Sequence, residues 1–147
     1  MVTSKAPDLV ALSARLRLAI ARTARRLRQE AGTELSPSLA SALATVERHG
    51  PLTPSELAEH ERVQRPTATR IVARLEQDGL VDRAGDPTDG RVSLVSATAD
   101  GRALLRRLRT RKDAYLAKRI RDLDSAEVQT LERAAAVLER LLEDERG

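Results

Sequence analysis

Asp89 and Arg91 stand two residues apart between two β-prone runs, in the stretch LVDRAGDPTDGRVSLVSAT. A carboxylate at this spacing can hold the long arginine side chain extended, which lowers the entropy lost when the guanidinium enters a groove. A single arginine on a thin hairpin suits the concentrated negative potential of a narrow DNA minor groove. The alternative is that Asp86 and Asp89 serve only the turn and that Arg91 is solvated. Asp89-Gly90 also favours a tight turn, because both residues tolerate positive φ.

A second set of hydrogen-bonding side chains lies upstream, on one face of the amphipathic stretch 66–77 and just before it. Arginine can donate two bonds to guanine, glutamine can pair with adenine, and threonine offers a hydroxyl and a methyl group. Apolar residues recur at helical spacing on the opposite face of the same stretch. Taken alone, this helix has the simpler interpretation of an ordinary solvated polar face. The candidate contact residues are Gln64, Arg65, Pro66, Thr67, Thr69, Arg70 and Arg74.

The composition excludes several classes of chemistry. The 147 residues include no cysteine, which removes disulfides, thiolate metal sites and cysteine nucleophiles together. With only two histidines, His49 and His60, a histidine-based metal site is not expected. The chain has no evident nucleophile–base pair and no glycine-rich phosphate loop, which argues against an enzyme. We therefore expect no catalytic residues, no cofactor and no metal.

Positive charge is concentrated in two parts of a chain whose net charge is +4. Residues 1–35 carry +4 and residues 99–121 carry +7, whereas residues 122–147 carry −5. Arginine supplies 23 of the 26 basic residues, which suits bidentate contacts with phosphate and guanine but also follows from codon bias in a GC-rich genome. For the basic run in residues 102–112 we expect mainly a solvated face that pairs with the acidic C-terminal helix, with phosphate contacts as the alternative. The run consists of Arg102, Arg106, Arg107, Arg109, Arg111 and Lys112.

Capping and turn residues divide the chain into elements in the order α-α-α-α-β-β-α-α. Ser36-Pro37 places a capping residue before a proline at the first helical position. The pairs Thr53/Glu56 and Asp124/Glu127 have the spacing of a capping box. The expected helices cover residues 8–30, 37–48, 54–60 and 66–77, strands follow at 80–84 and 92–97, and two more helices begin after residues 98 and 124.

The central stretch, residues 53–97, predicts a winged helix-turn-helix: a short capped helix, a tight polar turn, a second helix and a two-stranded hairpin. In this arrangement the second helix enters the major groove of double-stranded DNA. The expected fold class is mainly α with a small antiparallel β-hairpin, a winged helix-turn-helix flanked by N- and C-terminal dimerisation helices. The DNA-binding domain would span residues 36–98, and the helical dimerisation region residues 1–35 and 99–147.

From LTPSELAE onward, the chain resembles the MarR family of bacterial transcriptional regulators. The matching motifs are LTPSELAE, TATRIVARLEQDGLVDR, the wing DPTDGRVSLVSAT and the helix start TADGRALL. The resemblance implies a homodimer that binds a palindromic operator, usually as a repressor, and that in many members of the family is released by a small anionic or phenolic ligand. Carried over residue by residue, it places recognition-helix contacts on Thr69, Arg70 and Arg74, the wing-tip arginine on Arg91 and its steadying aspartate on Asp89.

The terminal helices have broad apolar stripes that the small central domain cannot cover alone. A twofold dimer that interleaves them would bury these stripes and place two recognition helices about 34 Å apart, one turn of DNA. The alternative is a monomer that folds its terminal helices back on itself. The residues expected in the dimer interface are Leu9, Leu12, Leu16, Leu116, Ile120, Val128, Leu131, Leu138 and Leu142.

No apolar run approaches the roughly 20 residues needed to span a bilayer, and the N-terminus lacks a signal-peptide core, so a cytoplasmic protein without a membrane partner is expected. Arginines of the first helix such as Arg15 or Arg22 could pair with an anionic effector, and stacking on an aromatic side chain is limited to Tyr115. A low-specificity, nucleoid-type DNA-binding protein with the same fold is the alternative function.

Overall fold

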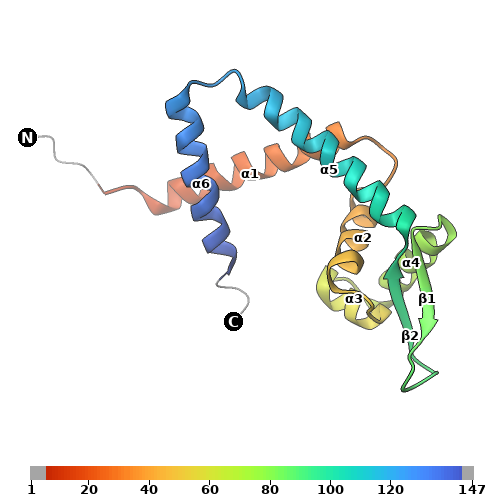
Figure 1. Ribbon diagram of the computed structural model, residues 1–147. Coiled ribbons are helices and arrows are strands. Elements are labelled where there is room, and N and C mark those ends of the chain that lie inside the picture. The colour runs from red at the N-terminus through yellow and green to blue at the C-terminus, as the bar shows by residue number, and fades with distance from the viewer. Residues whose placement is uncertain (1–5, 144–147) are drawn as a thin grey trace, which may run out of the picture. The chain divides into compact units, whose positions relative to one another are not determined.

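The computed structural model describes residues 6–143 of the chain. It forms two compact units, with the boundary between Lys112 and Asp113. Within the described residues, six helices and one two-stranded antiparallel sheet follow in the predicted order and confirm the fold class (Figure 1). They are α1 (Leu9–Ala31), α2 (Pro37–His49), α3 (Pro54–Glu61), α4 (Arg65–Gln77), β1 (Val81–Gly85), β2 (Ser93–Ala97), α5 (Ala99–Ile120) and α6 (Ser125–Glu143).

The helices begin at the capping residues that the sequence predicts. The hydroxyl of Ser36 accepts a hydrogen bond from the Leu39 amide at 3.3 Å, at the start of α2. Thr53 and Glu56 form a complete capping box at α3. At α6, each residue of the Asp124/Glu127 pair accepts a hydrogen bond from the backbone amide of the other, at 2.8 and 3.2 Å. Such caps satisfy amide groups that have no partner inside the helix.

The end of α4 explains why β1 starts one residue later than predicted. Gly79 adopts a positive φ of 74°. Its amide donates to the carbonyl of Glu76, and the Leu80 amide donates back to the carbonyl of Leu75 at 2.9 Å. This pair of bonds is a Schellman motif, so Leu80 still belongs to the helix end. The strand ladder begins at Val81, which pairs with Ala97.

The turn between the strands differs from the tight turn expected for Asp89-Gly90. The segment between β1 and β2 is residues 86–92, and neither Asp89 nor Gly90 is among the positive-φ residues of the described chain. A loop of this length does not require the positive φ angles that a two-residue hairpin needs. Val92 donates its amide to the Asp89 carbonyl at 3.0 Å and so belongs to the turn, which is why β2 starts one residue later than predicted.

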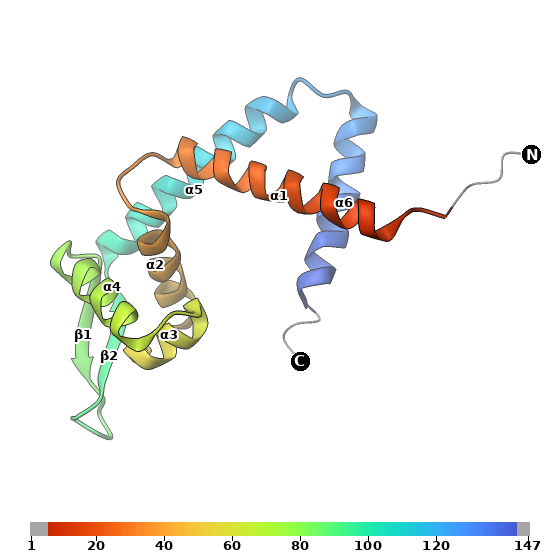
Figure 2. The ribbon, with the colours of Figure 1, turned by 180° about the vertical axis from the view of Figure 1, so that it is seen from behind.

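The core of the first unit lies between α2, α3, α4 and the hairpin, which the two views show packed together (Figures 1 and 2). Leu52 forms an isolated bridge with Val95 and thereby joins the chain before α3 to the hairpin. Aliphatic side chains alone fill this core, as the near absence of aromatic residues requires. The largest fully buried side chains are Leu43, Val46, Leu52, Leu57, Val72, Leu75, Val81 and Val95.

Thr98 and Gly101 join the hairpin to α5. The Thr98 amide donates to the carbonyl of Leu80, and its hydroxyl donates to the Gly79 carbonyl at 2.7 Å. The same hydroxyl accepts a hydrogen bond from the Gly101 amide at 3.0 Å, which caps α5 as predicted. Buried Gly101 thus lies close to the backbone that leads into β1.

Replacing Gly101 with alanine is expected to lower the free energy of unfolding by about 1–3 kcal/mol, the usual cost of overpacking. A Cβ at this position would overlap the carbonyl oxygen of Leu80 and approach the Leu43 side chain. Because that carbonyl accepts the Thr98 hydrogen bond, it cannot move aside without weakening it. Gly90→Ala is the matched control, since a Cβ there meets nothing within 4 Å. Equal unfolding midpoints for both variants would contradict this packing.

Helices α1 and α6 each have an exposed apolar face in the single chain. Large apolar side chains are exposed along the first four turns of α1, and α6 contains no fully buried residue. None of the described helices is both long and apolar enough to cross a membrane. The exposed large apolar residues of the two helices are Leu9, Val10, Leu12, Leu16, Leu18, Ile20, Leu131, Val137, Leu141 and Leu142.

Candidate nucleic-acid interface

Helices α3 and α4 and the short turn between them form the helix-turn-helix. Arg62 begins the turn in the left-handed conformation, with φ of 54°, and the next amide, of Val63, donates to the carbonyl of Ala58. Leu57 of α3 and Ala68 of α4 are both buried where the helices pack. Figure 2 shows α3 and α4 side by side, joined by this turn. The packing of their apolar faces turns the opposite face of α4 toward solvent.

The structure places nearly all the predicted major-groove residues on that solvent face. Gln64, Arg65, Pro66, Thr69, Arg70 and Arg74 are exposed, and Thr67 is half-buried. The Thr69 hydroxyl donates to the Arg65 carbonyl at 3.0 Å, which leaves its oxygen free to accept a further hydrogen bond. The Arg70 guanidinium reaches back to the Thr67 hydroxyl at 3.4 Å, a long and exposed contact that would be readily exchanged for a stronger acceptor.

The side chain of Arg74 has a shorter contact than that of Arg70, and a charged one. Its Nε lies 3.1 Å from a carboxylate oxygen of Asp78, one turn further along α4, while 63% of the Arg74 side chain stays exposed. An exposed pair at this spacing contributes little to stability. Asp78 therefore acts chiefly on the orientation of Arg74. Asp78 was missed in the sequence as a partner of Arg74, although the spacing of four residues along a helix is a signal for such a pair.

The N-terminus of α4 offers backbone donors beside these side chains. Gln64 occupies the capping position, but its side chain makes no capping hydrogen bond. The amides of the first helical turn consequently lack the partner that a serine or threonine cap would supply. A helix end of this kind favours an anion such as a phosphate.

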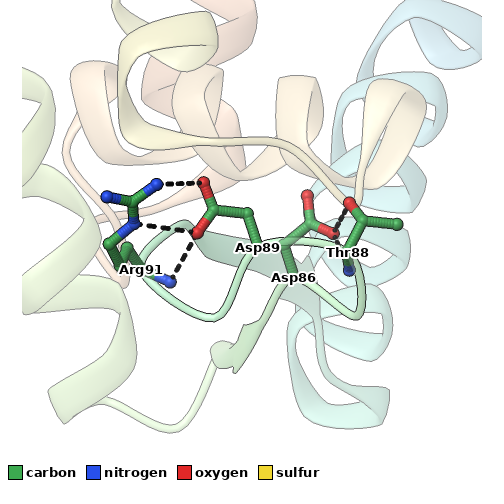
Figure 3. Close-up of polar contacts among 4 residues, drawn as sticks. All are labelled: Asp86, Thr88, Asp89 and Arg91. Atoms are coloured by element: carbon green, nitrogen blue, oxygen red, sulfur yellow. Dashed lines mark hydrogen bonds and ion pairs between the residues drawn. The ribbon is translucent and has the colours of Figure 1, made fainter.

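At the tip of the wing, the carboxylate of Asp89 accepts hydrogen bonds from both the backbone and the side chain of Arg91 (Figure 3). The Arg91 amide and Nε donate to one oxygen of the Asp89 carboxylate at 3.1 and 3.2 Å, and the terminal Nη2 approaches the other oxygen at 3.5 Å. The side chain of Arg91 is nevertheless 92% exposed. These hydrogen bonds hold the pKa of the Asp89 carboxyl below its usual value.

Asp86 has a different partner. Its carboxylate accepts hydrogen bonds from the amide and the hydroxyl of Thr88, at 2.8 and 2.7 Å (Figure 3). These bonds, the one from the Thr88 amide first, lower the pKa of the Asp86 carboxyl. An aspartate that bonds the backbone two residues on stabilises a turn. Asp86 therefore shapes the loop, while Asp89 is the carboxylate that contacts Arg91.

Asp89→Asn is expected to weaken DNA binding about three- to tenfold relative to Asp86→Asn, because Arg91 must then be ordered on binding. Both variants remove one negative charge beside the wing, so their comparison isolates the contact with Arg91. The pKa of Asp89 is depressed, so the carboxylate and its contact with Arg91 are present at any pH above the usual pKa of aspartate. The contact is lost only as the pH falls through the lowered pKa. Fluorescence anisotropy with a labelled DNA duplex measures the ratio of the two dissociation constants. Equal affinities would show that the contribution of Arg91 to DNA binding does not depend on Asp89.

Two contacts that link the wing to the helices were not predicted. Arg83 of β1 donates through Nε to a carboxylate oxygen of Glu76 in α4 at 3.1 Å. Arg102 of α5 donates to the carbonyl of Ala97, the last residue of β2, at 2.7 Å. The first pair joins the hairpin to α4. Its partners lie on different elements with no fixed spacing rule, so no sequence pattern signals the pair.

The basic run of α5 pairs differently from the expectation. Arg107 and Arg111 contact the carboxylate of Glu34 at 3.4 and 2.7 Å, and Arg109 contacts Glu47 at 3.0 Å. These carboxylates lie just after α1 and within α2, rather than on the acidic C-terminal helix. The hydrogen bond from Arg111 is the main cause that lowers the pKa of Glu34. The expectation of pairing with the C-terminal helix was therefore wrong for these three arginines.

Comparisons with known proteins agree with this geometry. The MarR family profile matches residues 35–93, which include α2 to β1, the loop of the wing and the first residue of β2. An uncharacterized HTH-type transcriptional regulator of Mycobacterium bovis is 38% identical over 134 residues, or 90% of this chain and 94% of the relative. The HTH-type transcriptional repressor IacR of Pseudomonas putida is 36% identical over 89 residues, or 60% of this chain and 53% of the relative.

A solved structure extends the match to the fold. A protein of Pseudomonas aeruginosa described as a transcriptional regulator superposes with a TM-score of 0.83 and 32% sequence identity, over 92% of this chain and 98% of that one. Its similarity covers the terminal helices as well as the winged helix-turn-helix. These relatives are transcriptional regulators and not enzymes. On sequence, fold and the helix-turn-helix with its wing, the chain belongs to the MarR family of DNA-binding transcriptional regulators.

Proposed function

We propose that the protein is a homodimeric, sequence-specific repressor that binds a palindromic operator in the cytoplasm. The observation that carries the proposal is the exposed face of α4, where Arg70 and Arg74 stand beside Thr69 and an uncapped helix N-terminus. Arginine reads guanine bidentately in the major groove, and the helix end supports a phosphate contact. Arg74 would exchange its contact with Asp78 for a base edge.

The wing would insert Arg91 into the adjacent minor groove. Its side chain is exposed and is already hydrogen-bonded to the Asp89 carboxylate. A narrow minor groove concentrates negative potential and attracts a single guanidinium. The Arg83–Glu76 pair would keep the hairpin at a constant angle to α4, so that α4 could contact the major groove while the wing contacts the minor groove.

A second copy of the chain would cover the terminal helices. Leu131 and Leu142 of α6 are 45% and 68% exposed in the single chain, and Leu9 of α1 is 69% exposed. Exposed apolar surface of this extent marks an interaction site. A twofold dimer would present two copies of α4 to successive turns of DNA, which matches a palindromic operator.

Repression and release by an effector are supported by two further observations. The relative IacR is a repressor. A cavity of about 360 Å³ lies between α1, α2 and the first part of α5, with an apolar lining that includes Leu27, Leu105 and Leu108. Arg28, Arg109 and Lys112 add positive charge to its wall. The combination suits a small anionic or phenolic effector with an apolar body.

Benzoate is expected to weaken operator binding by the wild type and to act more weakly on Arg28→Gln, because that variant lacks one cation of the cavity wall. Phenol has a similar ring but no charge at neutral pH, so its effect on operator binding should differ less between the wild type and Arg28→Gln. The measurement is a titration of each compound into the protein–operator complex, followed by anisotropy. Equal effects of benzoate on both proteins would contradict an anion site at Arg28.

The experiment that tests the proposed function is an unbiased selection of double-stranded oligonucleotides with the purified protein. Recovery of a palindrome whose half-sites are about one helical turn apart would support a specific dimeric regulator. Recovery of no consensus, with uniform coverage in footprinting, would favour a nucleoid-type protein instead. Repression is tested separately, by a reporter gene placed behind the selected operator.

A further inference from the structure

Arg62, which begins the turn between α3 and α4, has a backbone conformation that favours glycine. Its φ of 54° and ψ of 45° lie in the left-handed region, where the Cβ of an L-residue crowds the following carbonyl oxygen. Within residues 6–143, it is the only residue other than glycine with a positive φ. The chain places a glycine, Gly79, at the positive-φ position that ends α4. The arginine therefore destabilises its turn relative to glycine, and a compensating role falls to its side chain.

The side chain of Arg62 is exposed and has no carboxylate partner in the part of the chain that the structure describes. The carboxylate of Glu61, its neighbour in sequence, instead accepts hydrogen bonds from the hydroxyls of Ser41 and Thr45 in α2. The structural alternative is an interaction of the guanidinium with the dipole at the end of α3, which solvent and salt screen. The guanidinium is thus available to an anion outside the chain.

The place of Arg62 in the helix-turn-helix indicates which anion this is. It lies three residues before Arg65, the first residue of α4. The N-terminal residues of such a helix face base edges in the major groove, so the chain that leads into it passes the phosphates at the rim of the groove. The preceding helix, α3, carries the exposed carboxylates of Glu56 and Glu59, which repel phosphate. A cation at position 62 offsets this repulsion where the DNA backbone would pass.

We propose that Arg62 contacts a backbone phosphate of DNA and that the left-handed turn presents its guanidinium there. The inference rests on the DNA binding of the proposed function and assigns to it an anchoring residue outside the polar face of α4. A phosphate contact carries no sequence information, so Arg62 strengthens binding to the operator and to unrelated DNA alike. The same residue that destabilises the turn thereby increases affinity.

Arg62→Gly tests the proposal because it should change stability and DNA binding in opposite directions. Relief of the left-handed strain should raise the thermal unfolding midpoint by about 2–4 °C, measured by calorimetry. Loss of one phosphate contact per chain should weaken binding by the proposed homodimer about tenfold at physiological salt. It should also reduce the slope of log affinity against log salt concentration by about 2. Fluorescence anisotropy across a salt series measures both, with the selected operator and with an unrelated duplex.

Two further variants separate the charge of Arg62 from its backbone conformation. Arg62→Lys keeps both the charge and the strain, so its salt slope and its unfolding midpoint should stay close to those of the wild type. Arg48→Gln is the matched control for loss of charge, since Arg48 is also an exposed cation at the end of a helix, in the last turn of α2. It should leave the salt slope unchanged.

Each contrary outcome has a distinct meaning. Wild-type affinity and salt slope in Arg62→Gly, with operator binding weakened in Arg70→Ala, would overturn the phosphate contact and leave the proposed function intact. Weakening confined to the operator would overturn it in favour of base reading, and an equal loss in Arg48→Gln would reduce it to an effect of net charge. A wild type that binds no DNA would refute the proposed function itself. Failure to select any consensus would refute only its sequence specificity, because the contact is also measured on unrelated duplex.

Discussion

Arg70→Ala and Arg74→Ala should each weaken operator binding by about 2–6 kcal/mol per dimer. A good bidentate contact between arginine and guanine contributes about 1–3 kcal/mol of discrimination, and a twofold dimer loses it at both half-sites. Each variant should also relax the base preference at one position of each half-site. Competition binding with single-base variants of the selected operator measures both effects. Arg140→Ala on α6 is the control for losing one positive charge.

Arg74→Lys distinguishes base reading from general attraction. Lysine keeps the charge but not the planar fork, so binding to unrelated DNA should be preserved while operator preference falls. If affinity for the operator and for unrelated DNA fell equally in Arg74→Ala, the residue would contact phosphate only. If neither arginine variant changed operator binding, α4 would not be the reading helix.

Leu131→Asp should abolish the dimer and, with it, tight operator binding. In the proposed homodimer, the twofold axis would place two new carboxylates in an apolar contact, and each would cost several kcal/mol when desolvated without a partner. We expect a dimer dissociation constant raised about 1,000-fold or more, equivalent to about 4 kcal/mol. Light scattering across a concentration series measures the change. The remaining monomer would contact one half-site only.

Gln129→Asp is the matched control for this variant. It introduces the same charge two residues away, on the side of α6 opposite Leu131, at an exposed position. It should leave the oligomeric state and the operator affinity unchanged. A dimeric Leu131→Asp protein would exclude this face of α6 from the interface, whereas dissociation of both variants would indicate a general effect of charge on the helix.

The order of the elements and the starts of most helices follow from the sequence because they depend on local interactions. The Thr53/Glu56 capping box closes between residues three positions apart, whatever the rest of the chain does. The apolar spacing of residues 66–77 likewise determines which face of α4 is buried, and therefore leaves Arg70 and Arg74 exposed. The predicted exposure of the polar face of α4 was confirmed for the same reason, whereas the contacts of its side chains with DNA stay a prediction.

The strand ends and the turn were predicted less well, because two kinds of backbone bonding compete there. The side chain of Leu80 favours a strand, but its backbone amide donates to the Leu75 carbonyl at the C-terminal end of α4. Asp89-Gly90 resembles a two-residue turn, but the residues around it form a longer loop that Asp86 and Thr88 organise. Propensity alone does not decide which of two available partners a backbone group takes.

The assignment of partners to charged side chains required the tertiary structure. From the sequence, either Asp86 or Asp89 could have contacted Arg91, and only the course of the loop shows that Asp89 does so. The arginines of α5 bond to Glu34 and Glu47, which are distant in sequence, because the chain brings the end of α1 and α2 beside that helix. A guanidinium on a long flexible side chain takes the carboxylate that lies nearest in space. The sequence by itself therefore determined the helices and their polar faces, whose cause is local, and the fold decided which charges meet.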